Sequence, residues 1–206
     1  MTSIENITLE VADTAAAERF YAAAFGLGDR LRLRASEAPS TGFRGFTLSL
    51  IVSQPANVDA LIDAALEAGA TTLKPAAKSM WGYGGVVQAP DGTIWKVATS
   101  AKKNTGPATK QVDDVALLLG VSDIVASKKF YADHGLAVGK SFGRMYVEFA
   151  TTGVKLGLYR HKALAKDAGV SPEGRGSHRI AVVGGDAPLT DPDGFTWEAA
   201  SMAAKS

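Results

Sequence analysis

The chain has 206 residues, of which 46% are hydrophobic and 21% charged, and its formal net charge is +1. The longest basic runs are the pairs Lys102-Lys103 and Lys128-Lys129, so the clustered charge that a nucleic-acid partner needs is missing. Cysteine is absent, which excludes disulfides, thiolate nucleophiles and metals held by cysteine.

The first half of the chain alternates between predicted strands and helices. Asp13 is placed to cap a helix that ends at Gly26, where a left-handed residue fits. Apolar residues from Val58 to Leu66 recur at helical spacing, and Gly69 stops this second helix. Period-two alternation and apolar runs predict the strands of this half, at residues 4–11, 29–34, 46–52, 72–74, 85–88 and 94–99.

The second half begins after a polar segment with lysines, Gly106 and Pro107, which we interpret as a linker over residues 101–111. A helix is expected over residues 124–134. Beyond His161 the chain is expected to be irregular, because glycine, serine and proline gather between residues 169 and 177. The strands predicted here lie at residues 112–119, 138–142, 145–150, 154–159 and 180–183, with a last one after the turn that ends at Gly194.

Two groups of markers occur twice and in the same order. The strand end Val11-Ala12-Asp13 and the later pair Phe20-Tyr21 return as Val121-Ser122-Asp123 and Phe130-Tyr131, and the turn Pro90-Asp91-Gly92 before Trp95 returns as Pro192-Asp193-Gly194 before Trp197. A repeat of roughly a hundred residues is too long for a solenoid turn, so each copy should be a small domain or half-domain. We expect one copy at residues 1–100, the other at 112–200, and a tail at 201–206.

These markers resemble the vicinal oxygen chelate superfamily, which includes glyoxalase, bleomycin-resistance, fosfomycin-resistance and extradiol dioxygenase proteins. The resemblance covers nearly the whole chain. It implies an α+β fold in which tandem βαβββ units pair and their mixed sheets curl into cups, with the helices outside. Two units would be complete, near residues 46–100 and 112–160, and the flanking two abbreviated. Enzymes of this superfamily hold a divalent metal at the floor of the cup.

The resemblance also implies where metal ligands should stand. In the first copy these places hold Asn6, Thr47 and Lys96. Asparagine and threonine bind divalent ions weakly, and an ammonium group repels them. We therefore expect no metal in the first copy.

The second copy keeps two ligand types at the corresponding places, His178 and Glu198, and Asp114 could complete the set if it turned into the cup. One imidazole and two carboxylates would suit Mn, Fe, Ni or Zn. A divalent metal in the second copy is therefore an open alternative, and His178 as a loop residue that anchors the chain is the other.

A second group of residues suggests a ligand cup. Trp81 and Tyr83 stand among three glycines, which places stacking surface on backbone that can approach a ligand closely. Lys96 follows in the same predicted sheet and could meet an anionic group, while Tyr146 and Trp197 are further candidates for the wall of a cup. The alternative is that these aromatics belong to the core.

We therefore expect a glyoxalase/bleomycin-resistance-like protein that binds a small molecule in an aromatic cup without metal. The alternatives are a metal-dependent lyase, isomerase or dioxygenase that uses His178 and Glu198, and an interaction module that has lost its ligand. The expected partners are a small molecule and at most a second copy of the chain, since the protein should be a monomer or homodimer. An acidic N-terminal segment and the lack of an apolar run near ~20 residues favour a cytoplasmic location without a membrane span.

Overall fold

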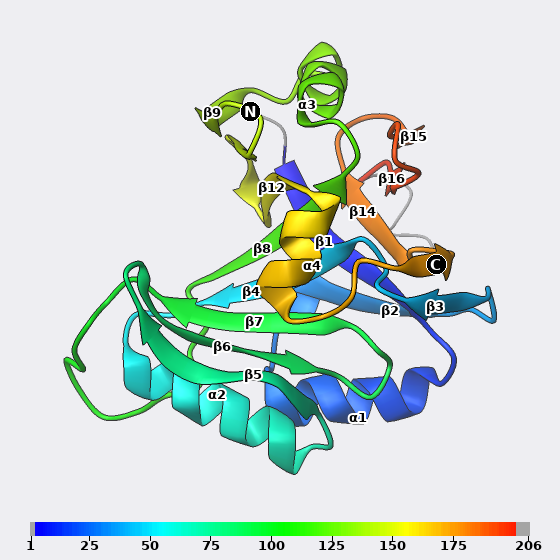
Figure 1. Ribbon diagram of the computed structural model, residues 1–206. Helices are drawn as coiled ribbons and strands as arrows, with labels where there is room; N and C mark the ends of the chain where they lie inside the picture. Colours follow the sequence, from blue (N-terminus) through cyan, green and yellow to red (C-terminus); the bar gives the residue numbers. More distant parts are fainter. Residues whose placement is uncertain (1–2, 201–206) are drawn as a thin grey trace.

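The computed structural model describes residues 3–200, and in this range the chain forms two large β-sheets, a two-stranded ribbon and four α-helices (Figure 1). The expected tail at 201–206 lies outside the described residues. The helices are α1 Thr14–Ala24, α2 Pro55–Glu67, α3 Ile124–Asp133 and α4 His161–Ala168, and a short 3-10 helix covers Gly28–Arg30. None of the helices in the described range is long and apolar enough to cross a membrane.

The eight-stranded sheet has the order β5-β6-β7-β4-β8-β12-β10-β9. Its strands are β4 Phe46–Ile51, β5 Thr71–Ser79, β6 Gly82–Gln88, β7 Ile94–Thr99, β8 Asp114–Val121, β9 Val138–Phe142, β10 Tyr146–Phe149 and β12 Lys155–Arg160. Each of the two complete units contributes four strands to this sheet. The units join through the antiparallel pair β4·β8, in which Ser49 lies opposite Ala116. The two predicted βαβββ units therefore form one continuous sheet.

The six-stranded sheet has the order β11-β1-β14-β16-β15, with β2 also paired to β1. Its strands are β1 Ser3–Val11, β2 Leu31–Ala35, β11 Thr152–Gly153, β14 Ile180–Gly184, β15 Leu189–Thr190 and β16 Thr196–Glu198, and the separate ribbon pairs β3 Ser40–Gly42 with β13 Gly174–Gly176. The two abbreviated units meet in the antiparallel pair β1·β14. Each large sheet thus takes one unit from each sequence copy.

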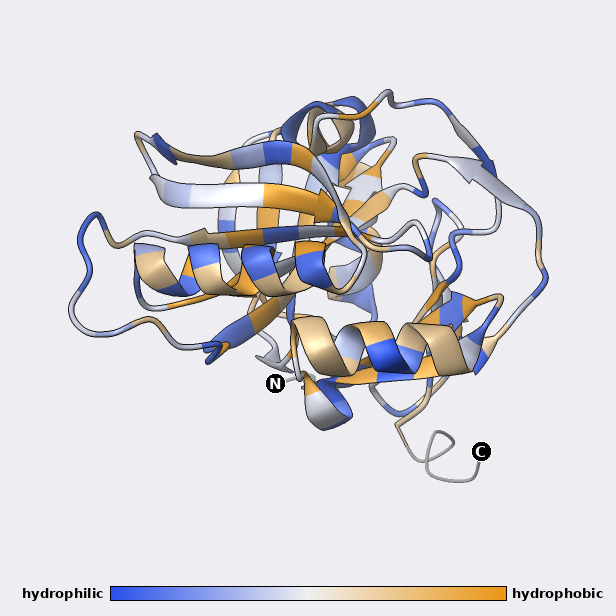
Figure 2. Ribbon diagram, turned by 90° about the horizontal axis from the view of Figure 1, so that it is seen from below, coloured by the Kyte–Doolittle hydropathy of each residue, from blue (hydrophilic) through white to orange (hydrophobic). Residues whose placement is uncertain are grey.

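Helices α1 and α2 lie on the outer side of the sheets; in Figure 2 hydrophilic residues recur along α2, whereas α1 is mostly pale orange with a hydrophilic stretch. Asp13 and Asp123 cap α1 and α3, because their carboxylates accept backbone N–H groups of Ala16 and of Val125 and Ala126. The repeated aspartate is therefore a helix start in both copies, as the sequence predicted.

The repeated tyrosine and tryptophan form the same kind of hydrogen-bond chain in both copies, and it ends on an aspartate of the turn: Asp91 in the first copy and Asp191, two places earlier in the turn, in the second. The indole N–H of Trp197 donates to the hydroxyl of Tyr131 at 3.3 Å, and this hydroxyl donates to Asp191 at 2.7 Å. In the first copy Trp95, Tyr21 and Asp91 repeat the arrangement at 3.4 and 2.8 Å. Burial raises the pKa of both tyrosines well above the usual value. The echo in the sequence thus marks a buried joint between the first helix of each copy and its last turn.

One prediction about the second half was wrong. The segment after His161 is the helix α4, which ends at Gly169 in the left-handed conformation with φ of 79°. Leu164, Ala165 and Ala168 are buried on one side of this helix, and they form a second apolar cluster with Val86 and other residues. The irregular stretch is confined to the residues that follow, up to β14.

This cluster shows that α4 lies on the concave face of the eight-stranded sheet. Along β7, Trp95 and Val97 belong to the main core on the α2 side, whereas Ile94 packs with α4. Alternate residues of a strand point to opposite faces, so α2 and α4 cover opposite faces of the same sheet (Figure 1). The concave face that the family resemblance predicts as a cup is therefore partly covered by the helix α4.

Candidate functional site

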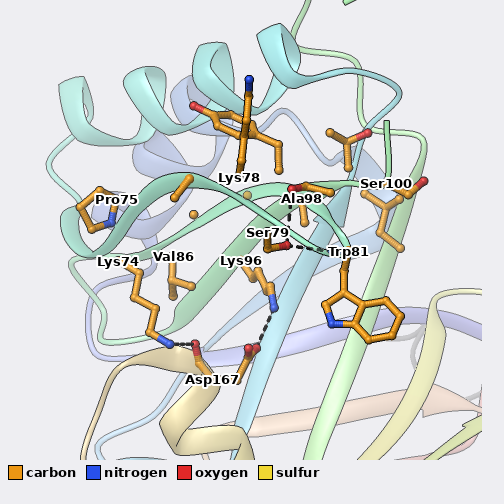
Figure 3. Close-up of a pocket in the computed structure, with 17 residues that line it drawn as sticks. Lys74, Pro75, Lys78, Ser79, Trp81, Val86, Lys96, Ala98, Ser100 and Asp167 are labelled. Carbon is orange, nitrogen blue, oxygen red and sulfur yellow. Dashed lines mark hydrogen bonds and ion pairs between the residues drawn. The ribbon is translucent and has the colours of Figure 1, made fainter. Parts of the chain in front are cut away.

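The concave face of the eight-stranded sheet holds a pocket of about 520 Å³ where the β5–β6 hairpin, β7 and the end of α4 meet (Figure 3). We call it the Trp81 pocket. Its lining includes Lys74, Lys78, Trp81, Lys96, Ala98, Ser100 and Asp167. The volume lies in the range of small-molecule sites.

Trp81 stands at the tip of the β5–β6 hairpin, and 83% of its surface is exposed. Its backbone N–H donates to the hydroxyl oxygen of Ser79 at 3.2 Å, which closes the tip. The next residue, Gly82, has φ of 137°, a conformation that side chains with a Cβ rarely adopt. An aromatic face is thus held in solvent on a turn that requires glycine.

Lys96 points into the Trp81 pocket from β7. Because its neighbours Trp95 and Val97 face the main core, Lys96 and Ala98 face the concave side. The ammonium group lies 2.8 Å from a carboxylate oxygen of Asp167 on α4. In Figure 3 the side chains of Lys74, Lys96 and Trp81 project to the same side of the sheet.

Lys74 holds the end of α4 in a different way. Its ammonium group donates to the backbone carbonyls of Lys166 and Asp167 at 2.8 and 2.6 Å. These carbonyls belong to the last turn, where a cation is favoured by the helix dipole. Lys74 therefore fixes the backbone of α4, whereas Lys96 binds only a side chain.

Tyr83 is a lining residue of the pocket, but its ring is directed away from the interior. Tyr83 shares a face of β6 with Val87, which is in the main core, and its hydroxyl donates to Asp59 of α2 at 2.7 Å. This hydrogen bond raises the pKa of the phenol. The expectation that Tyr83 would stack on a ligand is therefore corrected.

Tyr146 lies on the same concave face but outside the Trp81 pocket. Its hydroxyl donates to Glu148 at 2.9 Å, and its ring centre is 4.8 Å from that of Tyr159. Burial, followed by the bond to Glu148, raises the pKa of Tyr146. The sequence predicted that Tyr146 lines a ligand cup. In the structure it lies on the part of the eight-stranded sheet formed by β10 and β12, away from Trp81.

Trp197 is a core residue with 3% of its surface exposed. Its ring packs against that of Tyr131, with 5.7 Å between the ring centres, and the two residues share the hydrogen bond described above. The expectation that Trp197 contacts a ligand is corrected, because the residue is buried in the core and bonded to Tyr131.

The three metal candidates of the second copy are not brought together. Asp114 lies on β8 of the eight-stranded sheet and pairs with Lys155 at 2.6 Å. Glu198 lies on β16 of the six-stranded sheet, and the ring of His178 stacks on Phe195 with 4.0 Å between centres. Within residues 3–200 no three histidine or acidic side chains form a group that could hold a metal ion.

The hydrogen bonds of His178 explain why it is unsuited to coordination. Nδ1 faces the backbone carbonyl of Arg44 at 2.6 Å, and Nε2 faces that of Asp193 at 3.0 Å. Both ring nitrogens are thus engaged by the backbone. This is the anchoring role that the sequence left open.

The concave side of the six-stranded sheet has an arginine between carboxylates. Arg34 on β2 contacts Glu10 on β1 and Glu198 on β16, each at 2.7 Å. Strands β1 and β14 separate β2 from β16, so this contact spans the curled sheet. On the six-stranded sheet the guanidinium group of Arg34 already neutralises the carboxylates of Glu10 and Glu198. On the concave face of the eight-stranded sheet the ammonium group of Lys96 would repel a cation. Neither group of side chains therefore fits a divalent ion.

Sequence reasoning missed Asp167 and Lys74 as parts of the site. Asp167 was missed because α4 was interpreted as irregular chain, although Leu164 and Ala168 have helical spacing and Gly169 is a suitable helix end. Lys74 follows a bulge in β5, between Thr72 and Lys74, which period-two counting does not detect.

Comparison with known proteins gives a likeness in structure only. No family model and no curated protein sequence matches the chain. Glyoxalase I from Zea mays is similar at a TM-score of 0.63 and 14% identity over 97% of this chain and 92% of that one. A variant of the maize enzyme gives 0.63 and 14% over 100% and 96%. A candidate dioxygenase from Bacillus subtilis subsp. subtilis strain 168 gives 0.60 and 11% over 96% and 84%.

These similarities cover nearly the whole chain, so they concern the arrangement of all four units. The protein has the α+β fold seen in glyoxalase I, as expected from the repeated markers. At 11–14% identity this likeness shows the fold and leaves the function to the site.

Proposed function

We propose that the protein binds a planar small molecule in the Trp81 pocket and that binding requires no metal ion. The observation that carries the proposal is the exposed indole of Trp81 beside Lys96, on the concave face where this fold places its cup. A large aromatic side chain exposed to 83% at a pocket mouth is not explained by packing. It offers a ligand a stacking surface.

The chemistry of the pocket supports a ligand with one apolar and one polar end. The indole can stack on an aromatic ring, and the Lys96 ammonium can donate hydrogen bonds to a polar or anionic edge. Asp167 is the one acidic residue among the lining residues in the described range, which also include Lys74, Lys78 and Lys96. This excess of positive charge favours anionic over cationic ligands.

Replacing Trp81 by alanine should weaken binding of 2-naphthoate, a two-ring probe, several-fold while the protein stays folded. Stacking is worth ~0.5–1.5 kcal/mol beyond area burial, which corresponds to a loss of about two- to tenfold. Calorimetric titration measures the affinity, and thermal unfolding tests the fold.

Met80→Ala is the matched control, because Met80 is the neighbouring hairpin residue, is 81% exposed and is not a lining residue. Equal affinities of wild type and Trp81→Ala would contradict the site. A Trp81→Ala protein that unfolds would return Trp81 to a structural role.

A metal-dependent lyase, isomerase or dioxygenase centred on His178 and Glu198 has no comparable support. Its two side chains are bound to Arg44, Asp193 and Arg34. Nothing in the described geometry favours such an enzyme, so we propose metal-free binding of a small molecule.

A further inference from the structure

We infer that the ligand of the Trp81 pocket carries a carboxylate and that this carboxylate replaces Asp167 as the partner of Lys96. The inference rests on the proposed function and adds the class of ligand and a residue that controls its affinity. Asp167 would then act as an internal competitor, a side chain that occupies the anion position until the ligand arrives.

The charges around the pocket point to this exchange. The Lys74 ammonium is bound to backbone carbonyls of α4, whereas the partner of the Lys96 ammonium within the described residues is the Asp167 carboxylate at 2.8 Å. Asp167 therefore shows that this ammonium group can donate to a carboxylate, and at which distance. A ligand carboxylate would satisfy the same ammonium with the same geometry.

Asp167 can leave Lys96 without unfolding α4. Lys74 holds the backbone carbonyls of Lys166 and Asp167, and Leu164 is completely buried in the cluster beneath the helix. The side chain of Asp167 is 43% exposed and that of Lys96 is 34% exposed. Because exposed ion pairs are weak, rotation of the carboxylate into water costs little.

Trp81 offers a binding surface for the part of the ligand that does not contact Lys96. Figure 3 shows the indole on the same side of the sheet as the Lys96 ammonium group, with Asp167 below Lys96. A molecule whose carboxylate reaches Lys96 can therefore lay an aromatic body against Trp81. The inferred class of ligand is an aromatic carboxylate.

The test compares 2-naphthoate with its neutral isostere 2-naphthamide on wild type, Asp167→Asn and Lys96→Met. Removing the competing charge should tighten binding of 2-naphthoate roughly two- to fivefold, the size expected for an exposed ion pair, and leave 2-naphthamide unchanged. Lys96→Met should abolish the preference for the acid over the amide.

Asp133→Asn is the matched control, because it breaks the exposed ion pair with Lys129 on α3, away from the pocket. It should change neither affinity. If Trp81→Ala weakens the binding of 2-naphthoate but Asp167→Asn leaves it unchanged or weakens it, the competitor role is overturned and the proposed function stands. If neither probe binds to wild type or to Asp167→Asn, both proposals are overturned.

Discussion

Replacing Asp191 by alanine should lower the free energy of unfolding by about 3–5 kcal/mol, because the substitution removes three hydrogen bonds and strands buried donors. One carboxylate oxygen accepts the N–H groups of Asp193 and Phe195 at 3.0 and 2.8 Å, and the other accepts the hydroxyl of Tyr131. Burial raises the pKa of this carboxyl group, while its hydrogen bonds act in the opposite direction. Urea-induced unfolding measures the loss.

The repeat supplies the control for this experiment. In the first copy the acceptor of the tyrosine hydroxyl is Asp91, which corresponds to Asp193 in the repeated turn; it accepts the N–H of Thr93 and the hydroxyl of Tyr21. It has fewer of these bonds and is only half-buried, so Asp91→Ala should cost less than Asp191→Ala. A loss below about 1 kcal/mol for Asp191→Ala would show that the joint contributes little.

The second large effect is expected at Leu164, the buried centre of α4. Leu164→Ala should destabilise the protein by about 2–5 kcal/mol, because it leaves a cavity beneath a helix of only two turns. Thermal or urea-induced unfolding measures this effect.

Lys162→Ala on the same helix is the control, since Lys162 is exposed, and it should change stability by less than about 0.5 kcal/mol. Similar small losses for both variants would mean that α4 is not docked on the concave face.

Much of the fold could be predicted because each unit carries local signals. Asp13 and Asp123 cap helices, and the glycine-containing turns begin final strands, so the units could be counted from the sequence. How they pair could not be predicted in this way. A repeat shows which segments are alike, whereas the contacts β4·β8 and β1·β14 join unlike halves of different copies.

The candidate site was predictable only in part, for a related reason. Lys96 and Trp81 line a common pocket, but the Tyr83 hydroxyl is bound to Asp59 on α2 and Trp197 is buried in the core. Composition identifies an aromatic residue and does not determine the side of the sheet to which it points. The position of Asp167 could be predicted only if α4 was recognised as a helix. The apolar residues of α4 form one short stripe between polar residues, which is a weak signal.

We propose that the Trp81 pocket binds its ligand without a metal ion. The most direct test is calorimetric titration of chelator-treated protein with 2-naphthoate, carried out with and without added Mn²⁺. We predict saturable binding with one site per chain and the same affinity in both conditions, because no described group of side chains can hold the ion. Binding that appears only when Mn²⁺ is present would contradict the claim.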